Sequence, residues 1–263
     1  MKLSFRWLNA FGLGIVIAVN YLADRIPIGG KTTGQIAAEY PVLIQPAPYA
    51  FGIWLLIYAL LTGFIIYSFT PQGRGSRAVA AVNPYFLYSC FFNVAWIFAW
   101  HAQKINSSVI IIFALLASLA AIYSRLRSKP ALPPSLADRV WVWLPFSVYL
   151  GWICVASVVN VAVSLYAAQW EGFGLSAETW TLIMLTIVVL LALGIGLRYR
   201  DPFFMAVFVW AIIAIGVANQ ATHPGISVYC YLCAMLLLAA ISTVVAHYRS
   251  FINFAGFIIH LIK

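Results

Sequence analysis

The chain has 263 residues, of which 64% are hydrophobic and only 8% are charged, and its formal net charge is +9. A soluble domain is typically about 45–50% apolar and about 25% charged, so this chain has too few charges to cover a soluble surface. A bilayer removes that requirement because lipid solvates apolar side chains. The basic residues stand between apolar runs rather than on one face, which favours orientation in a membrane and argues against nucleic acid as a partner.

Apolar runs of spanning length recur along the sequence. A spanning helix needs about 20 largely apolar residues, each adding about 1.5 Å. Eight runs meet or approach this length: 7–22, 50–69, 84–103, 107–124, 140–166, 179–197, 203–220 and 226–246. We therefore predict an all-α, polytopic transmembrane helical bundle of about eight spans. The first run follows Lys2 and Arg6 as in a signal peptide, but no small-x-small cleavage site follows it, which favours an uncleaved first span.

Residues at the ends of the runs carry the signals of helix starts. Asn83-Pro84 and Asp201-Pro202 each place an N-cap residue before a proline that would take the first helical position. Ser135 and Asp138 form a capping-box pattern ahead of the fifth run. These signals predict helices that begin where the apolar runs begin.

The loops between the runs divide the 15 Lys and Arg residues unequally between the two sides of the membrane. Arg25, Lys31 and Lys104 fall on one side, and the other 12 fall on the opposite side. The positive-inside rule then predicts that the N- and C-termini are cytoplasmic. The basic loop 125–139 is interpreted as an anchor against anionic lipid. The tail 251–263 is too short to span and is expected to lie in the interface plane.

No Asp, Glu, Lys or Arg falls in the middle of any apolar run, so a proton-driven pump or a charge-lined ion channel is not expected. No phosphate-binding glycine loop, nucleophile elbow or zinc-spaced motif occurs, and no catalytic or metal-ligating residue is predicted. The four histidines fall at run ends or in the tail; we interpret them as interfacial, with a haem or metal ligand as the alternative. Cys230 and Cys233 are interpreted as packing residues because a redox pair needs a thiolate, which hydrocarbon disfavours.

Aromatic and amide side chains, in contrast, occur deep in three of the runs. Three groups share one helix face each, by their spacing: Trp54 and Tyr58; Asn93, Trp96 and Trp100; Trp152, Ala156 and Asn160. An asparagine inside a membrane needs a partner or water, so these faces should point into the bundle. They line either a packed interior or an apolar pocket, and spacing alone favours packing.

These residues also carry a resemblance to a known family. The second run has a proline-rich entry, a phenylalanine and Trp-x-x-x-Tyr over 46–58. The third run has Asn-x-x-Trp over 93–96, and the fifth has Tyr-Leu-x-Trp-x-x-x-Ala-x-x-x-Asn over 149–160. In type and order these motifs resemble the tryptophan-rich sensory protein family (TspO/MBR, which includes the mitochondrial translocator protein). Two departures, Ile53 in place of a proline and the loss of a proline and phenylalanine stretch after Trp96, imply an altered pocket shape.

The resemblance implies a domain organisation. Residues 1–166 would form a TspO-like five-helix transmembrane bundle with an aromatic pocket, and the outer loop 23–49 would cover that pocket as a lid. Residues 167–250 would add three transmembrane helices that extend the bundle or dock a partner, and residues 251–263 would form the interfacial tail.

The resemblance also implies a site for flat, apolar ligands: porphyrins, haem and other tetrapyrroles, or sterol- and isoprenoid-like lipids. The expected partners are membrane lipid and this small ligand, with a homodimer or a larger membrane complex left open, and no cofactor is required. The expected location is the bacterial plasma (inner) membrane. The ligand-binding residues expected from the matched motifs are Trp54, Tyr58, Asn93, Trp96, Trp152, Ala156 and Asn160.

The leading hypothesis is thus a non-enzymatic membrane sensor, carrier or regulator. The alternatives are a structural or assembly subunit of a larger membrane complex, and a transporter of an uncharged lipophile. An enzyme is not predicted because no acid–base pair is recognisable. Light-driven porphyrin breakdown, known in some family members, is implied by the resemblance only.

Overall fold

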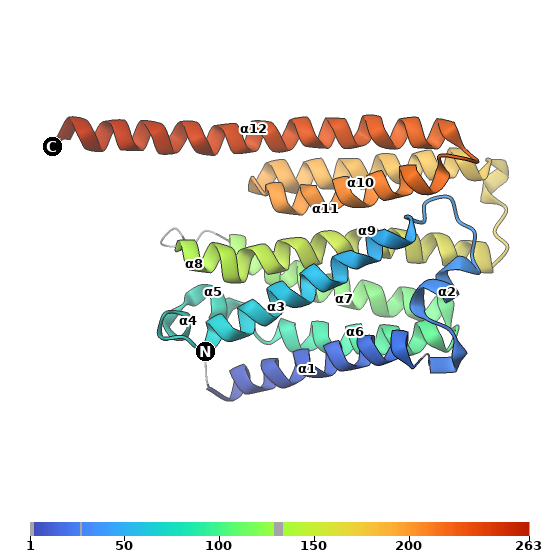
Figure 1. The fold of residues 1–263 in the computed structure, drawn as a ribbon, viewed down its shortest axis with the longest axis horizontal. Helices are drawn as coiled ribbons and strands as arrows, with labels where there is room; N and C mark the ends of the chain where they lie inside the picture. Colours follow the sequence, from blue (N-terminus) through green and yellow to red (C-terminus); the bar gives the residue numbers. More distant parts are fainter. Residues whose placement is uncertain (1–2, 27, 129–133, 263) are drawn as a thin grey trace.

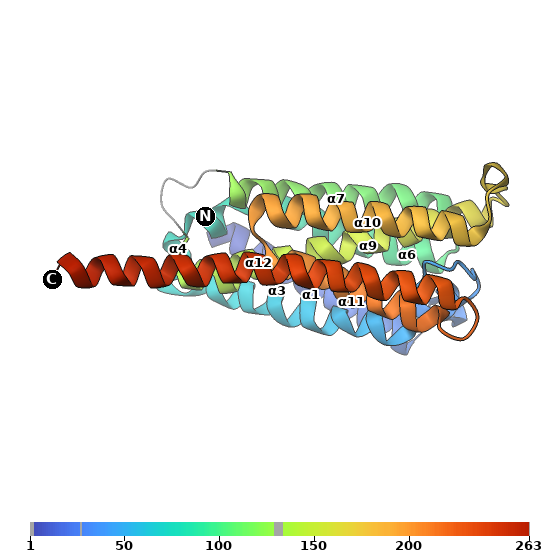
Figure 2. The same cartoon turned by 90° about the horizontal axis from the view of Figure 1, so that it is seen from above.

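The computed structural model describes the backbone of residues 3–26, 28–128 and 134–262, and side chains as far as residue 246. Every regular element in these ranges is helical. The long helices are α1 (Leu3–Arg25), α3 (Ile53–Phe69), α6 (Tyr85–His101), α7 (Ile105–Arg127), α9 (Leu144–Ala167), α10 (Ala177–Tyr199), α11 (Pro202–Asn219) and α12 (Pro224–Ile262). They run roughly along one axis in a single bundle (Figures 1 and 2).

Short helical elements occupy the connections. They are η1 (Ile28–Gly30), α2 (Thr33–Ala38), η2 (Pro48–Gly52), α4 (Pro71–Gly75), α5 (Arg77–Ala81), α8 (Leu136–Asp138), η3 (Arg139–Trp143) and η4 (Gly172–Gly174). Since α12 continues to Ile262, the tail predicted to lie in the interface is helical and contiguous with the last span. Its position in the interface plane stays a prediction.

Seven helical segments in the described ranges are long and apolar enough to cross a membrane. The remaining predicted run, 84–103, forms α6, whose 17 residues reach about 25 Å at 1.5 Å per residue and so stand at the short end of the spanning range. This helix packs against α1 on one side and α7 on the other (Figure 1). The prediction of an all-α, multi-pass membrane bundle is therefore confirmed.

The connections gather at the two ends of the bundle. One end, called here the α2 end, holds α2, the α6–α7 and α11–α12 connections and η4, on the right of Figure 1. The opposite end, called the N-terminal end, holds the start of α1, the helices α4, α5 and α8, and the α10–α11 connection. The described parts of the loops that the basic residues assign to the cytoplasm lie at this second end. Which end faces the cytoplasm stays a prediction.

Two of the predicted helix starts differ in how well they match the structure. The Asp201 side chain accepts a hydrogen bond from the Phe204 backbone N–H, with Pro202 at the first helical position, so this N-cap is confirmed. The N-cap predicted at Asn83 is wrong, because α6 begins at Tyr85 and Pro84 takes the cap position. The first turn of α6 is satisfied by backbone carbonyls instead, since the Phe86 N–H donates to the Val82 carbonyl at 3.2 Å.

The capping box predicted at Ser135 and Asp138 is half formed. The Ser135 hydroxyl accepts a hydrogen bond from the Asp138 N–H at 3.0 Å, as predicted. The Asp138 carboxylate does not return to the cap residue; it accepts hydrogen bonds from the hydroxyls of Tyr67 and Ser76. This side chain therefore links α8 to the end of α3 and to the start of α5.

The basic loop predicted to anchor in lipid contributes one residue to the protein interior. Arg127 is almost completely buried and forms an ion pair with Asp201, which is also buried. The same carboxylate oxygen accepts hydrogen bonds from Ser147 at 2.6 Å and from Tyr123 at 3.0 Å. The Arg127 side chain therefore does not contribute to a lipid anchor, because a buried partner 74 residues away in sequence lies beside it; that the rest of loop 125–139 anchors in lipid stays a prediction. The cluster joins α7, α9 and the start of α11.

One apolar core extends through the bundle from α1 to α12. At its centre Phe64, Phe86 and Phe146 pack edge to face with ring centroids 5.3–5.8 Å apart. Phe204 and Phe208 of α11 are fully buried in the same core. The helices after residue 167 thus share the interior of the first five spans, and their division into separate segments stays a prediction of the sequence.

Candidate ligand-binding site

A cavity of about 770 Å³ lies at the α2 end, bordered by α1, α2, α3 and α6. α1 and α3 spread apart toward the α2 end (Figure 1), and residues of both helices line the cavity there. Asn20 and Tyr21 of α1, Trp54 and Tyr58 of α3, and Trp96 of α6 contribute to its walls.

A second, smaller space of about 50 Å³ adjoins the first and extends it toward α9. Both spaces are lined by Gln45, Phe51 and Trp96, so they form one site with a large outer and a small inner chamber. The face of α9 that the sequence predicted, with Trp152 and Asn160, lines the inner chamber.

The structure brings six of the seven predicted ligand-binding residues to this site. Trp54 and Tyr58 line the outer chamber. The inner chamber is lined by Trp152, Ala156 and Asn160, and Trp96 lines both chambers. Asn93 lines neither chamber. It is buried behind the wall, where its amide accepts a hydrogen bond from Asn20 at 2.8 Å and donates one to the Tyr149 hydroxyl at 3.0 Å. That any of the seven contacts a ligand stays a prediction.

The aromatic rings of the site are fixed against one another. Trp54 stacks on Tyr58 with centroids 5.5 Å apart and meets Trp152 edge to face at 6.3 Å. Trp96 stacks on Trp100 at 5.3 Å. Because stacked and edge-to-face pairs hold rings in defined orientations, the chambers have stiff aromatic walls suited to a planar, apolar molecule.

The polar atoms of the site fall into two classes. The Trp96 indole N–H donates to the Asn160 side-chain oxygen at 2.8 Å, and the Asn160 amide donates to the Ser108 hydroxyl at 2.9 Å, so these groups are satisfied within the protein. The Tyr58 hydroxyl, the Trp152 indole N–H and the Gln45 side-chain oxygen are buried and have no hydrogen-bond partner among the described residues. Unpaired buried polar groups are costly. All three belong to residues that line the chambers, where a ligand would satisfy them.

The loop between α1 and α3 contributes one wall of the cavity, and its role as a lid stays a prediction. Thr32 and Gln35 form a capping box that starts α2. The Trp100 indole N–H donates to the Thr33 carbonyl at 3.2 Å, and Gln103 donates to the Glu39 carboxylate at 3.0 Å. The first half of the loop is therefore attached to the end of α6.

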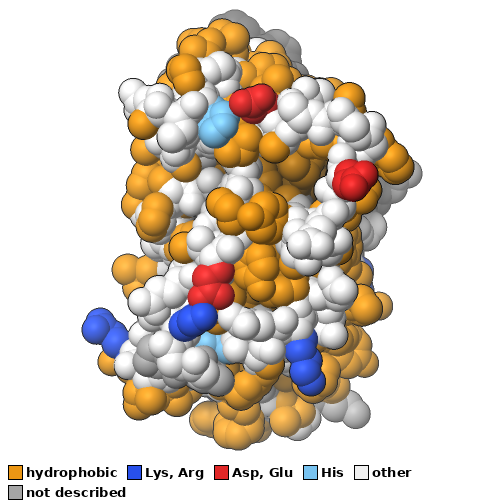
Figure 3. All heavy atoms as spheres, turned by 90° about the vertical axis from the view of Figure 1, so that its right-hand side faces the viewer, with side chains coloured by type: hydrophobic (Ala, Val, Ile, Leu, Met, Phe, Trp, Pro, Cys, Tyr) orange, Lys and Arg blue, Asp and Glu red, His pale blue; other side chains and the backbone are white. Residues whose placement is uncertain are grey.

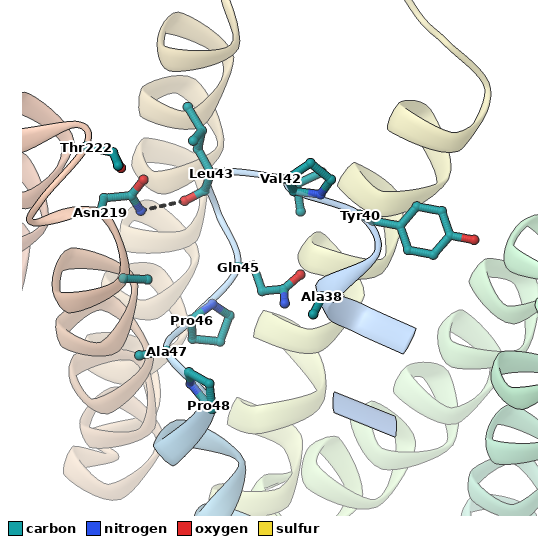
Figure 4. Close-up of a pocket in the computed structure, with 12 residues that line it drawn as sticks. Ala38, Tyr40, Val42, Leu43, Gln45, Pro46, Ala47, Pro48, Asn219 and Thr222 are labelled. Carbon is teal, nitrogen blue, oxygen red and sulfur yellow. Dashed lines mark hydrogen bonds between the residues drawn. The ribbon is translucent and has the colours of Figure 1, made fainter. Parts of the chain in front are cut away.

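The second half of the loop is attached to α11, one of the helices added after the fifth span. The Asn219 amide donates to the Leu43 carbonyl at 2.8 Å, a bond drawn in Figure 4. The Ala47 N–H donates to the Ala214 carbonyl at 3.0 Å, and Trp210 donates to the carbonyl of Ala50 at 3.1 Å. The loop is thus held between α6 and α11, and the added helices help to shape the site.

Sequence reasoning missed several residues that the fold brings to the site. Gln45 lines both chambers and also a groove of about 360 Å³ between the loop and α11 (Figure 4). Its only sequence signal is an amide beside a proline-rich stretch. Asn20 and Asp24 line the outer chamber from the end of α1, and nothing in their spacing set them apart from other interfacial residues. The α2 end carries few charged side chains, with apolar side chains visible in its hollows (Figure 3).

A family model described as TSPO-like protein matches residues 6–243 of the chain. The matched range includes α10, α11 and much of α12, and so reaches well beyond the 1–166 over which the motifs were recognised. No curated protein and no solved structure matches the chain.

Proposed function

This integral, multi-pass membrane chain belongs to the family of TSPO-like proteins, and we propose that it is a sensor or carrier that binds a flat, largely apolar molecule in the two-chambered cavity at the α2 end. Tetrapyrroles such as porphyrins, and sterol- or isoprenoid-like lipids, are the candidate ligands. The observation that carries the proposal is the set of fixed aromatic rings around a cavity into which three residues bring unpaired polar atoms.

The size and chemistry of the cavity support binding. A volume of about 770 Å³ falls within the roughly 300–1,000 Å³ of typical small-molecule sites. Such sites combine apolar walls with a few placed polar groups, which is the composition seen here. Each aromatic pair is worth about 0.5–1.5 kcal/mol beyond the area it buries, so several rings give a planar ligand useful affinity.

The proposal is tested by quenching of tryptophan fluorescence in the detergent-purified protein. The probe is protoporphyrin IX dimethyl ester, a flat ring without charge. We expect saturable quenching, with an affinity about fivefold weaker in Trp152→Phe and in Asn160→Leu, because each change removes about 1 kcal/mol of ring contact or wall structure. Trp7→Phe is the matched control, since Trp7 is exposed and packs on Phe69 at the N-terminal end.

Weak, non-saturating quenching shared by all variants would contradict the proposal and favour an assembly subunit whose aromatic faces pack against partners. Trp210, although it lies outside the first five spans, would not serve as a second control position, because its indole N–H donates a hydrogen bond to the Ala50 carbonyl in the loop that borders the cavity.

A further inference from the structure

Among the described residues that line the outer chamber, one carries a charged side chain, the carboxylate of Asp24. Asp24 lies in the last turn of α1 at the α2 end, and its carboxylate accepts a hydrogen bond from the Thr33 N–H at 3.3 Å. Ile17, which also lines the chamber, is seven residues earlier in the helix and so about 10 Å deeper. Asp24 is exposed and therefore marks the mouth of the cavity.

The two cations nearest in sequence do not line the chamber, although Arg25 packs on the ring of Tyr21, which does. Lys31 forms an ion pair with Glu39, which also accepts a hydrogen bond from Gln103. The Arg25 guanidinium lies 5.9 Å from the centroid of the Tyr21 ring and does not line the chamber. A carboxylate on a ligand at the mouth would thus meet a like charge without a lining cation, whereas a hydroxyl or an amine would meet an acceptor.

The deep part of the site does not favour an anion either. Tyr58 lies five residues into α3 from its start at the α2 end, about 7.5 Å from it, and Trp152 lies in the inner chamber. Their two unpaired donors suit a carbonyl or another neutral acceptor. A carboxylate there would be buried among aromatic rings without a cation, and burying an unpaired charge costs far more than two hydrogen bonds return.

We infer that this cavity selects flat ligands that carry no negative charge, and that Asp24 is the residue that discriminates against carboxylates at the mouth. The ligand class is an uncharged or cationic planar molecule with a neutral acceptor at its inner end and a hydroxyl or amine at its outer end. The inference rests on the proposed function because it concerns the same cavity.

The test compares two probes that share one ring. Protoporphyrin IX carries two carboxylates, and its dimethyl ester carries none. Both are titrated into wild type, Asp24→Asn and Glu171→Gln. Asparagine keeps the acceptor for the Thr33 N–H, and Glu171→Gln removes a carboxylate from the same end of the molecule that does not line the chamber. The measured quantity is the change in the ratio of the two affinities from wild type to each variant, because the different partitioning of the probes into detergent affects that ratio equally in every protein.

We expect Asp24→Asn to reduce the ratio of ester to diacid affinity at least threefold relative to wild type, by improving diacid binding. Glu171→Gln should leave the ratio unchanged. A ratio that Asp24→Asn does not change overturns the inference while the cavity remains a ligand site. Saturable binding of neither ring overturns the proposed function, and the inference with it.

Discussion

At the scale of single residues, the site is marked by polar atoms that the protein leaves unpaired. Tyr58→Phe keeps the ring that stacks on Trp54 and removes only the hydroxyl. We expect the affinity for the porphyrin ester to fall about fivefold, since a neutral hydrogen bond is worth about 1 kcal/mol. The thermal midpoint without ligand should stay equal or rise, because the variant no longer buries a hydroxyl that has no hydrogen-bond partner. Fluorescence titration and a thermal melt measure the two quantities, and an unchanged affinity would remove Tyr58 from the site.

The buried ion pair is the residue-scale feature with the largest expected effect on stability. Asp201→Asn leaves the Arg127 charge buried without its counter-ion, which typically costs about 3–5 kcal/mol. A thermal melt in detergent should show a clear fall in the midpoint. Glu178→Gln is the control, because the Glu178 carboxylate is exposed and a surface contact such as the one it makes with His223 is worth about 0–1 kcal/mol. Equal melting of the two variants would show that the Arg127 pair does not stabilise the fold.

At the scale of helices, α9 and α11 approach each other at a glycine. A Cβ at Gly151 would lie 3.1 Å from the Val207 Cβ and 3.2 Å from the Phe204 carbonyl oxygen. Small residues allow such close approach between membrane helices. Because α11 also holds the lid loop, a displaced α11 disturbs the cavity as well as the core.

Gly151→Val should therefore lower both the melting midpoint and the ligand affinity. Overpacking at this contact should reduce the free energy of unfolding by about 1–3 kcal/mol. Gly194→Val is the matched control, since a Cβ at Gly194 of α10 has no neighbour within 4 Å. A variant at Gly151 that melts early yet binds the porphyrin ester normally would separate the α9–α11 contact from the shape of the site.

At the scale of the whole molecule, the unequal distribution of basic residues predicts which end faces the cytoplasm. Gln72 is exposed at the N-terminal end, and Ala168 is exposed at the α2 end. The four natural cysteines are buried, so an introduced cysteine is the group that a membrane-impermeant maleimide reaches. In intact cells Ala168→Cys should label and Gln72→Cys should not, until the membrane is opened. The reverse labelling pattern would show that the α2 end, not the N-terminal end, faces the cytoplasm.

The sequence by itself determined the class of fold and the position of most helices. Runs of about 20 apolar residues have one stable form in a bilayer, because each backbone polar group must be satisfied within its own helix. The spacing of Trp54 and Tyr58, and of Trp152 and Asn160, likewise determined that each pair shares a face, since the helical period is a local property. These predictions depend on neighbours in sequence, and the structure agrees with them.

Only the tertiary structure decided which faces meet and which side chains find partners. Asn93 and Trp96 share one helix face by spacing, yet Asn93 hydrogen-bonds to Asn20 and Tyr149 while Trp96 lines the cavity. Arg127 belongs to a basic loop in sequence, yet its side chain is buried beside Asp201. Pairing, burial and the space left between diverging helices depend on contacts between residues far apart along the chain. Local pattern carries no information about those contacts, and so the cavity, its lid and its attachment to α11 belong to the packed molecule alone.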